Sequence, residues 1–348
     1  MNEITYSKVG IDINKHKEIV SKIWKLIVST WKKSEFCKPI DVKGHYAGII
    51  DVGLKNSYLA MHVDGVGTKM IIARLMNDFR TVGLDCVGMC ANDLICVGAR
   101  PIAMIDYIGG RELNSKVVQD IISGLVKGCE IAEMALVGGE TATMPDVLNE
   151  YDLVGMVVGV VDRSKIITGE KMKVGDVVIG LESSGLHSNG YTLARKVLFS
   201  KYKVHDFVEE LGKTMGEELL IPTKIYVKPV LEIIKNCEVH GLANITGGAF
   251  SKLMRVGERA GVGFLLDTMP ELPKIFKLIQ EKGNISDREL YRTFNCGIGF
   301  CVVVPEDETK KVVNISERYG IRAKRIGKVV KEKDVKIKTS TGVISILI

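Results

Sequence analysis

A nine-residue run without a single charged or hydrogen-bonding side chain, Leu153–Val161, constrains the fold more than any other stretch. Both alternate sets of its side chains are apolar or glycine, which is typical of a strand buried on both faces of a sheet. We therefore expect residues 151–161 to form an inner strand that is covered on both sides. The run is far shorter than the roughly 20 residues that a membrane-spanning helix needs, so no membrane segment is expected.

The size and charge of the chain narrow the class of protein. Its 348 residues suggest two domains, and 46% hydrophobic and 26% charged residues are typical of a globular protein. The net charge of +6 is spread along the chain without a dense Lys/Arg block, so a small anionic ligand is expected and a nucleic-acid partner is not. Eight scattered cysteines without a C-x-x-C pair argue against a zinc ribbon or a disulfide framework. Free thiols and the absence of a signal-peptide pattern at the start indicate a cytoplasmic protein.

Helical and strand-like patterns alternate in both halves of the chain. The spacing of apolar residues predicts helices over 15–32, 70–77, 115–135, 191–199, 274–280 and 308–318. It predicts strands over 58–63, 102–107, 151–161, 177–181, 262–266, 298–304, 322–329 and 343–348. The order is not a strict βαβ repeat, so an α+β (mixed α/β) fold with mixed or antiparallel sheets is favoured. The charged, glycine-containing stretch 162–176 predicts a boundary between domains 1–165 and 166–348.

Two polar clusters suggest a phosphate and metal site. Asp64-Gly-Val-Gly-Thr-Lys69 follows a predicted strand, and its glycines would let backbone N–H groups approach a phosphate. Lys69 could supply positive charge and Asp64 could hold Mg²⁺. An ordinary turn without a ligand is an equally weighted alternative. Asn92-Asp93 lies in an apolar stretch, where Asp93 could face Asp64 as a second ligand or act as a turn or N-cap residue. Asp85 competes for the same role.

Further glycine-rich stretches follow predicted strands or helices. Gly138-Gly-Glu-Thr141 combines an open backbone with a carboxylate and a hydroxyl, although it could also be a simple corner. Ser183–Tyr191 is dense in hydrogen-bonding groups ahead of a helix, where Ser188 or Asn189 could receive a phosphate or act as an N-cap. No H-E-x-x-H motif and no serine-nucleophile elbow occur. These residues indicate a nucleotide-using enzyme and leave its reaction open.

The set and order of these motifs resemble the phosphoribosylformylglycinamidine cyclo-ligase family, also called aminoimidazole ribonucleotide synthetases. The resemblance begins at Y-S-K-V-G-I-D-I (6–13) and continues through D-G-V-G-T-K, M-C-A-N-D-L, V-G-G-E-T-A-T-M-P, S-S-G-L-H-S-N-G-Y, P-T-K-I-Y-V, I-T-G-G and F-N-C-G-I-G. It implies an N-terminal α/β domain that builds a β-barrel at a homodimer interface, and a C-terminal α+β domain. It also implies that ATP and Mg²⁺ are used to close the imidazole ring of formylglycinamidine ribonucleotide, which yields ADP and phosphate.

The resemblance also implies roles for individual residues. Asp64 and Asp93 would hold Mg²⁺, Lys69 would neutralise phosphate charge, and Lys69, Asp93 and His187 would be catalytic. The nucleotide or substrate would contact Asp64, Gly65, Gly67, Thr68, Lys69, Asn92, Gly138, Gly139, Glu140, Thr141, Ser188 and Asn189. Three positions depart from the family pattern, which has Glu at Thr143, Pro at Leu186 and His at Asn244.

Other families share part of this pattern. The amidotransferase synthetase that makes the cyclo-ligase's substrate is usually longer, and selenophosphate synthetase carries a reactive Cys or selenocysteine that has no counterpart here. Thiamine monophosphate kinase lacks the H-S-N-G-Y and V-G-G-E-T-A strings in this form, and a hydrogenase maturation factor belongs to the same superfamily. A non-catalytic regulatory subunit could have lost carboxylates, whereas Asp64, Asp93 and Glu140 are all present.

Overall fold

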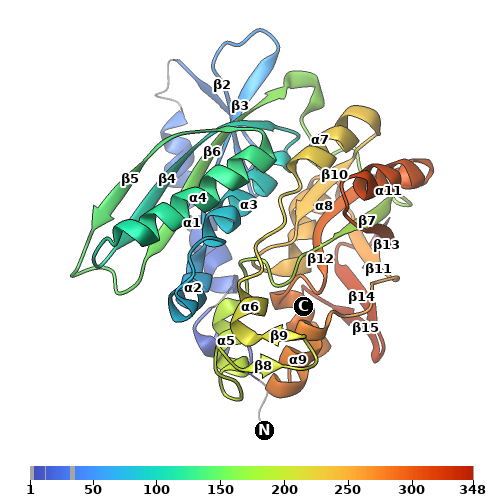
Figure 1. The fold of residues 1–348 in the computed structure, drawn as a ribbon. Helices are drawn as coiled ribbons and strands as arrows, with labels where there is room; N and C mark the ends of the chain where they lie inside the picture. Colours follow the sequence, from blue (N-terminus) through green and yellow to red (C-terminus); the bar gives the residue numbers. More distant parts are fainter. Residues whose placement is uncertain (1–3, 12, 32–35, 348) are drawn as a thin grey trace.

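The computed structural model describes residues 4–11, 13–31 and 36–347, and it contains two large sheets (Figure 1). The first sheet has the strand order β1-β2-β3-β6-β4-β5. Its strands are β1 (Lys38–Ile40), β2 (Gly48–Asp51), β3 (Ser57–Gly65), β4 (Arg100–Gly110), β5 (Ala135–Thr143) and β6 (Asp152–Asp162). All pairings in it are antiparallel except the parallel pair β4–β5.

The second sheet has seven strands in the order β10-β12-β7-β13-β11-β14-β15. They are β7 (Val177–Glu182), β10 (Gly241–Asn244), β11 (Gly263–Leu266), β12 (Ile298–Val304), β13 (Ala323–Val330), β14 (Val335–Thr339) and β15 (Gly342–Ser345). A small hairpin joins β8 (Phe207–Val208) to β9 (Lys213–Thr214). Only β11 and β14 pair in parallel within the second sheet. The mixed, largely antiparallel sheets confirm the predicted α+β class.

The helices pack against these sheets and against one another. They are α1 (Ile13–Ser29), α2 (Met70–Met76), α3 (Val82–Ile95), α4 (Ser115–Ala132), α5 (Tyr191–Leu198), α6 (Met215–Leu219), α7 (Val227–Asn236), α8 (Met254–Ala260), α9 (Lys274–Gly283), α10 (Asp287–Thr293) and α11 (Thr309–Arg318). Helix α3 contacts β3, β6 and β4 and lies beneath α4, so this pair covers one face of the first sheet (Figure 1). Helix α7 contacts α3, α4 and α11 and thereby lies between the two halves of the molecule.

The apolar run forms β6, but only one of its faces is buried within the chain. Leu153 and Val157 face α3 and are completely buried, whereas alternate residues such as Met156 and Val158 remain partly exposed. The expectation of burial on both faces is therefore wrong for a single chain. The reason is that both covering helices lie on the same side of the sheet.

The predicted helix over 115–135 is confirmed as α4. Asn114 caps it, because its side chain accepts hydrogen bonds from the backbone N–H groups of Lys116 and Val117. The predicted helix over 15–32 corresponds to α1, although its predicted last residue, Lys32, lies outside the described residues. Its apolar positions Ile19 and Leu26 are 47% and 70% exposed, so they do not join the core.

In two places the structure contradicts one of the alternatives that the sequence left open. Asn92-Asp93 is neither a turn nor an N-cap, because both residues lie in the last turns of the buried helix α3. Gly138-Gly-Glu-Thr141 is not a corner, because it lies inside edge strand β5, where β4 supplies the backbone hydrogen bonds. The boundary placed between residues 165 and 166 stays a prediction.

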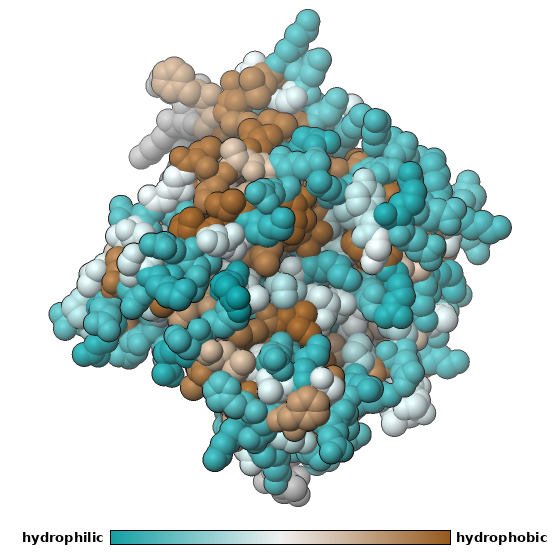
Figure 2. Space-filling view, in the orientation of Figure 1, coloured by the Kyte–Doolittle hydropathy of each residue, from teal (hydrophilic) through white to brown (hydrophobic). Residues whose placement is uncertain are grey.

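Figure 2 shows hydrophobic surface gathered over the upper part of the N-terminal half, near β2 and β3, and a mostly hydrophilic C-terminal half. Among the described residues, no helix combines the length and hydrophobicity needed to cross a membrane.

Candidate active site

Asp64 and Asp93 come together at the junction of the two halves. Strand β3 carries His62 and Asp64 on the same face, because side chains two residues apart along a strand share a face. That face is covered by α3, which contributes Asp93. One ligand atom from each of the three residues lies within 4.8 Å of the others, which is compatible with a shared metal ion. The two aspartates could be paired from the sequence, and the signal for His62, its alternation with Asp64 along the strand, was not used.

Burial makes this carboxylate pair costly without a cation. The pKa of Asp64 is raised because burial and the nearby charge of Asp93 both disfavour its ionised form. Asp93 is only 3% exposed, and its Oδ1 accepts a 2.7 Å hydrogen bond from Asn244 Nδ2. Its Oδ2 lies 3.4 Å from His62 Nε2. Asn244, where the family pattern has His, therefore contacts this site directly from strand β10.

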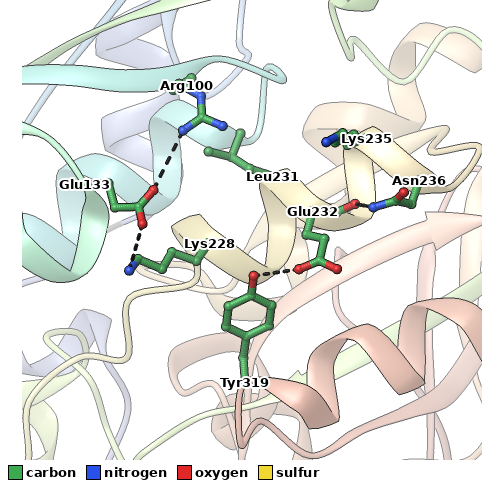
Figure 3. Close-up of a pocket in the computed structure, with 8 residues that line it drawn as sticks. All are labelled: Arg100, Glu133, Lys228, Leu231, Glu232, Lys235, Asn236 and Tyr319. Carbon is green, nitrogen blue, oxygen red and sulfur yellow. Dashed lines mark hydrogen bonds and ion pairs between the residues drawn. The ribbon is translucent and has the colours of Figure 1, made fainter.

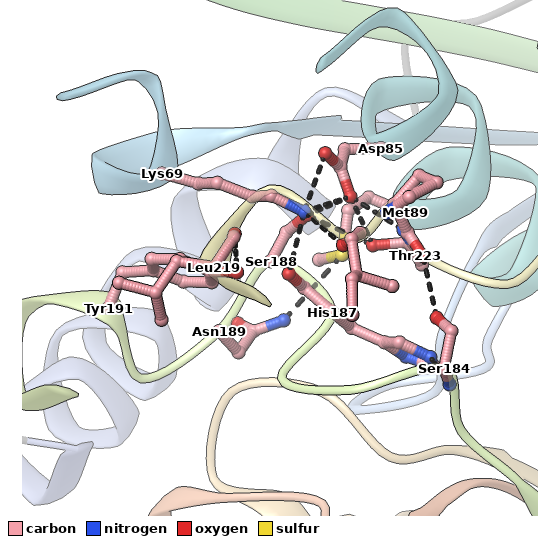
Figure 4. Close-up of polar contacts among 12 residues, drawn as sticks. Lys69, Asp85, Met89, Ser184, His187, Ser188, Asn189, Tyr191, Leu219 and Thr223 are labelled. Carbon is pink, nitrogen blue, oxygen red and sulfur yellow. Dashed lines mark hydrogen bonds and ion pairs between the residues drawn. The ribbon is translucent and has the colours of Figure 1, made fainter. Parts of the chain in front are cut away.

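Lys69 lies at the centre of a different, closed network (Figure 4). Its ammonium is completely buried, lies 2.9 Å from Asp85 Oδ1 and donates to the backbone oxygens of His187 and Ile221. An ammonium has three N–H donors, and these partners engage them all. The predicted contact between Lys69 and a phosphate is therefore not favoured by this geometry, in which the lysine joins helix α3 to the C-terminal half.

Asp85 and Asn92 hold the segment 222–226 against helix α3. Asp85 Oδ1 accepts hydrogen bonds from the backbone N–H and hydroxyl of Thr223 and from the hydroxyl of Ser188. The Asn92 amide donates to the Lys224 carbonyl and accepts from the Tyr226 N–H. The side chains of Asp85, Asn92 and Ser188 are thus engaged in hydrogen bonds within the protein.

The imidazole of His187 is buried beside this network. Its Nε2 accepts hydrogen bonds from the backbone N–H groups of Ser184 and Lys224, while Nδ1 has no partner among the described residues. Burial, followed by the charges of Lys69 and Lys224, lowers the pKa of His187 to about 3. The ring is therefore neutral near pH 7, and its predicted catalytic role stays a prediction.

The Gly-Gly-Glu-Thr stretch lies at some distance from Asp64 on the same sheet. Asp64 pairs with Gly155, Gly155 with Asp106, and Asp106 with Gly139, so these four residues form one row across β3, β6, β4 and β5. Three strand spacings place Gly139 about 14 Å from Asp64. Gly138, Glu140 and Thr141 flank Gly139 and are exposed along the edge strand.

The remaining predicted residues lie nearer the junction. Gly65 ends β3 and donates its N–H to Asp64, while Gly67 has a positive φ of 68° at the start of a 3₁₀ turn. Thr68 is exposed and lies 3.2 Å from the hydroxyl of Thr192. Asn189 lies beside Gly247, so the loops S-N-G and I-T-G-G are neighbours.

A group of basic and aromatic residues lies next to the two aspartates. The group comprises His45, Tyr46, Lys252 and Arg255. None of these four residues was identified as a site residue from the sequence. The buried Tyr46 hydroxyl donates to the carbonyl of Lys252, and its ring lies 5.8 Å from the Lys252 ammonium and 4.8 Å from the Arg255 guanidinium. Both ring nitrogens of His45 are buried without a partner among the described residues. Burial, with Arg259 and Arg255, lowers the pKa of His45 to about 3.

An open pocket of about 430 Å³ lies elsewhere between the two halves (Figure 3). Glu133 bridges it, because its carboxylate lies 2.9 Å from Lys228 Nζ and 3.9 Å from Arg100 Nη1. On its other side the Tyr319 hydroxyl donates to Glu232. None of the predicted site residues lines it, so we assign it no part in the site.

The fold is shared with several solved structures of low sequence identity. A chain of the HypE–HypF complex aligns with a TM-score of 0.67 at 18% identity, over 93% of this chain and 97% of that one. Thiamine-monophosphate kinase from Stenotrophomonas maltophilia aligns with a TM-score of 0.63 at 16% identity, over 90% and 95%. T. maritima PurL complexed with ATP aligns with a TM-score of 0.60 at 15% identity, over 86% of this chain and 44% of that longer chain.

Sequence relatives are much closer. Family models match residues 44–161 (AIR synthase related protein, N-terminal domain) and 173–340 (AIR synthase related protein, C-terminal domain). The phosphoribosylformylglycinamidine cyclo-ligase of Methanocaldococcus jannaschii is 47% identical over 95% of this chain and 94% of its own length. That of Pyrococcus horikoshii is 46% identical over 96% and 98%. The chain therefore belongs to the phosphoribosylformylglycinamidine cyclo-ligase family.

Proposed function

We propose that the chain uses ATP to close the imidazole ring of formylglycinamidine ribonucleotide, which yields 5-aminoimidazole ribonucleotide, ADP and phosphate in purine biosynthesis. The observation that carries this proposal is the near full-length similarity to cyclo-ligases, at 42–47% identity. The facing carboxylates Asp64 and Asp93 add a site of suitable chemistry at the junction of the two halves.

The reaction requires a poor leaving group to be activated. Transfer of the γ-phosphoryl group of ATP to the formyl oxygen turns that oxygen into a phosphate ester, and ADP leaves. The neighbouring nitrogen then attacks the activated carbon, and the C–O bond breaks to release phosphate. Such a transfer depends mainly on alignment and charge neutralisation, which fixed carboxylates, cations and backbone N–H groups supply.

Asp64 and Asp93 fit a magnesium ion. Both are oxygen donors and come from two rigid elements, and burial and the nearby charge of Asp93 raise the pKa of Asp64. When bound, Mg²⁺ would neutralise phosphate charge. The Asn244 amide holds Asp93 in place through Oδ1, which leaves Oδ2 facing His62 and able to act as a ligand.

The reaction is tested by measuring ADP and the aminoimidazole product with Mg²⁺-ATP, with and without formylglycinamidine ribonucleotide. We expect ADP and product in equal amounts, and ADP without product would refute the cyclo-ligase assignment. Asp93→Asn should lower turnover at least about 100-fold because it removes a buried charge at the site. The exposed Asp146→Asn is the matched control and should retain wild-type turnover.

We further propose that the chain works as a homodimer in which the uncovered face of the first sheet is buried. Val63, Met156 and Ile105 form a cross-strand row on that face. Val63 is 61% exposed and Ile105 is 45% exposed. A continuous apolar sheet face of this kind is typical of a protein interface. A second copy would restore the two-sided burial that the composition of β6 indicates.

A further inference from the structure

The hydrogen bonds of Lys69 within the protein do not leave its ammonium free to bind a phosphate. All three N–H donors of Lys69 are engaged inside the protein, and its side chain has no exposed surface. Phosphoryl transfer nevertheless places several negative oxygens in a small volume, and these need cations or N–H donors on more than one side. The question is which other side chain near Asp64 and Asp93 has a free donor.

Lys252 has the required position. It belongs to the 3₁₀ helix Ala249–Leu253, which directly follows the I-T-G-G loop at the end of strand β10. The Tyr46 hydroxyl holds its backbone carbonyl at 3.2 Å, so the N-terminal half fixes this helix in place. The ammonium then lies over the Tyr46 ring, at 5.8 Å from its centre.

Lys252 also has an ammonium that the protein does not engage through an acceptor. Among the described residues, its Nζ makes no ion pair and no hydrogen bond, and its contact is with the face of the Tyr46 ring. Burial and the charge of Arg255 lower the pKa of Lys252 to about 8, while the charges of Asp93 and Asp64 act in the opposite direction. The ammonium is thus held next to the Tyr46 ring without a protein acceptor, in a place where an anion would complete its contacts.

We propose that Lys252 donates to a phosphate oxygen of the bound substrates, beside the carboxylate pair Asp64 and Asp93. This inference rests on the proposed function, because it assigns a contact within that site. Two substrates carry phosphate, namely ATP and the ribonucleotide, and the chemistry of the contact is the same for both. Lys252 supplies the fixed positive charge that the sequence suggested for Lys69.

The test compares Lys252→Met, which keeps the length of the side chain and removes its charge, with Lys252→Arg, which keeps the charge. Lys277→Met is the matched control, because Lys277 lies on the outer side of α9 in an exposed pair with Glu271. Binding of Mg²⁺-ATP, Mg²⁺-ADP and formylglycinamidine ribonucleotide is measured separately by titration calorimetry. Circular dichroism checks that each variant is folded.

We expect Lys252→Met to lower the affinity for at least one of the phosphate-containing ligands by about 10- to 100-fold, because a charge-assisted hydrogen bond is lost. Lys252→Arg should bind within about threefold of wild type, since the guanidinium can replace the donor. If Lys252→Met binds ATP more weakly and ADP as tightly as wild type does, Lys252 contacts the γ-phosphate. If only the binding of the ribonucleotide is weakened, Lys252 contacts the phosphate of the ribonucleotide. Unchanged binding of all three ligands to a folded Lys252→Met would overturn the proposal.

The two proposals can fail separately. A wild-type protein that binds Mg²⁺-ATP and forms no aminoimidazole product would refute the proposed function. In that case the ATP titration of Lys252→Met still decides whether Lys252 contacts the nucleotide. A wild-type protein that binds none of the three ligands would overturn both.

Discussion

Two carboxylates near the candidate site, Asp85 and Asp93, have different hydrogen-bond partners. This difference favours different roles for them. Asp85 accepts hydrogen bonds from Thr223 and Ser188 and also faces Lys69, so its charge is used to join the two halves. Asp93 is held by the amide of Asn244 and keeps Oδ2 directed toward His62. This geometry favours Asp93 over Asp85 for the proposed metal role.

His62 should be a nitrogen ligand of a divalent ion bound by Asp64 and Asp93. Its Nε2 has no hydrogen-bond partner among the described residues, and paramagnetic Mn²⁺ can replace Mg²⁺ as a probe because both take carboxylate ligands. We expect pulsed EPR of bound Mn²⁺ to show coupling to a ¹⁴N nucleus that disappears in His62→Gln, with affinity weakened by about 10-fold. The exposed His205→Gln should leave the signal unchanged. A wild-type spectrum without nitrogen coupling would exclude His62 as a ligand.

His187 should make stability depend on pH. Its pKa in the folded protein is about 3, below the value of roughly 6.5 in an unfolded chain, so only the unfolded state gains this proton between these pH values. Stability must therefore fall as the pH drops below 6.5. His187→Asn tolerates the positive φ of 61° and keeps an acceptor for the Ser184 N–H.

We expect urea unfolding of His187→Asn to show a shallower loss of stability between pH 6.5 and 4.5 than wild type. The difference in slope should approach about 1.4 kcal/mol per pH unit, the value for one proton. Parallel slopes in the two proteins would show that the folded protein binds a proton at His187 in this range.

At the scale of helices and strands, the close approach of α3 and α4 depends on glycine. A Cβ atom at Gly83 would overlap the backbone of Ile121, Gly124 and Leu125 in α4. Gly83→Ala should therefore destabilise the protein by about 1–3 kcal/mol, although alanine favours an isolated helix by about 1 kcal/mol. The exposed Ser123→Ala in α4 is the control and should be neutral or slightly stabilising. Thermal melting distinguishes these outcomes, and a stabilised Gly83→Ala would contradict the packing described.

The elements differ in how far their sequences determine them. Helix α4 could be predicted because its N-cap and its apolar stripe both depend on local sequence. Helix α3 was missed because nearly all its positions are buried, so no polar face marks its period. The strand conformation of Gly138-Gly139 comes from pairing with β4, which is a tertiary effect that two glycines in sequence do not reveal.

The same limit applies to the site. The D-G-V-G-T-K and N-D motifs correctly bring Asp64 and Asp93 together, because both lie where rigid elements reach the junction. The functions of the neighbouring polar residues depend on which half of the molecule they contact. Lys69 and Asn92 bond to segments more than 100 residues away, and no local pattern shows that these bonds consume their donors.

At the scale of the whole molecule, one uncovered sheet face remains to be explained. Residues of β6 directed away from α3 are apolar, yet the described part of the chain leaves them only partly buried. The row Val63, Met156 and Ile105 crosses the middle of this face. Burial of such a surface contributes about 25 cal/mol per Å², which favours association through this face.

A charge placed in that row should separate the subunits. Ile105→Glu would bury an unpaired carboxylate in the proposed interface, at a cost of several kcal/mol, so we expect a monomer in sedimentation velocity at micromolar concentration. Val343→Glu is the matched control, because Val343 is 59% exposed on strand β15 of the other sheet, and it should sediment as the wild-type dimer. A monomeric wild type, or an Ile105→Glu variant that remains dimeric, would show that this face does not join two chains. Dissociation with intact circular dichroism would instead assign the second buried side of β6 to a neighbouring subunit.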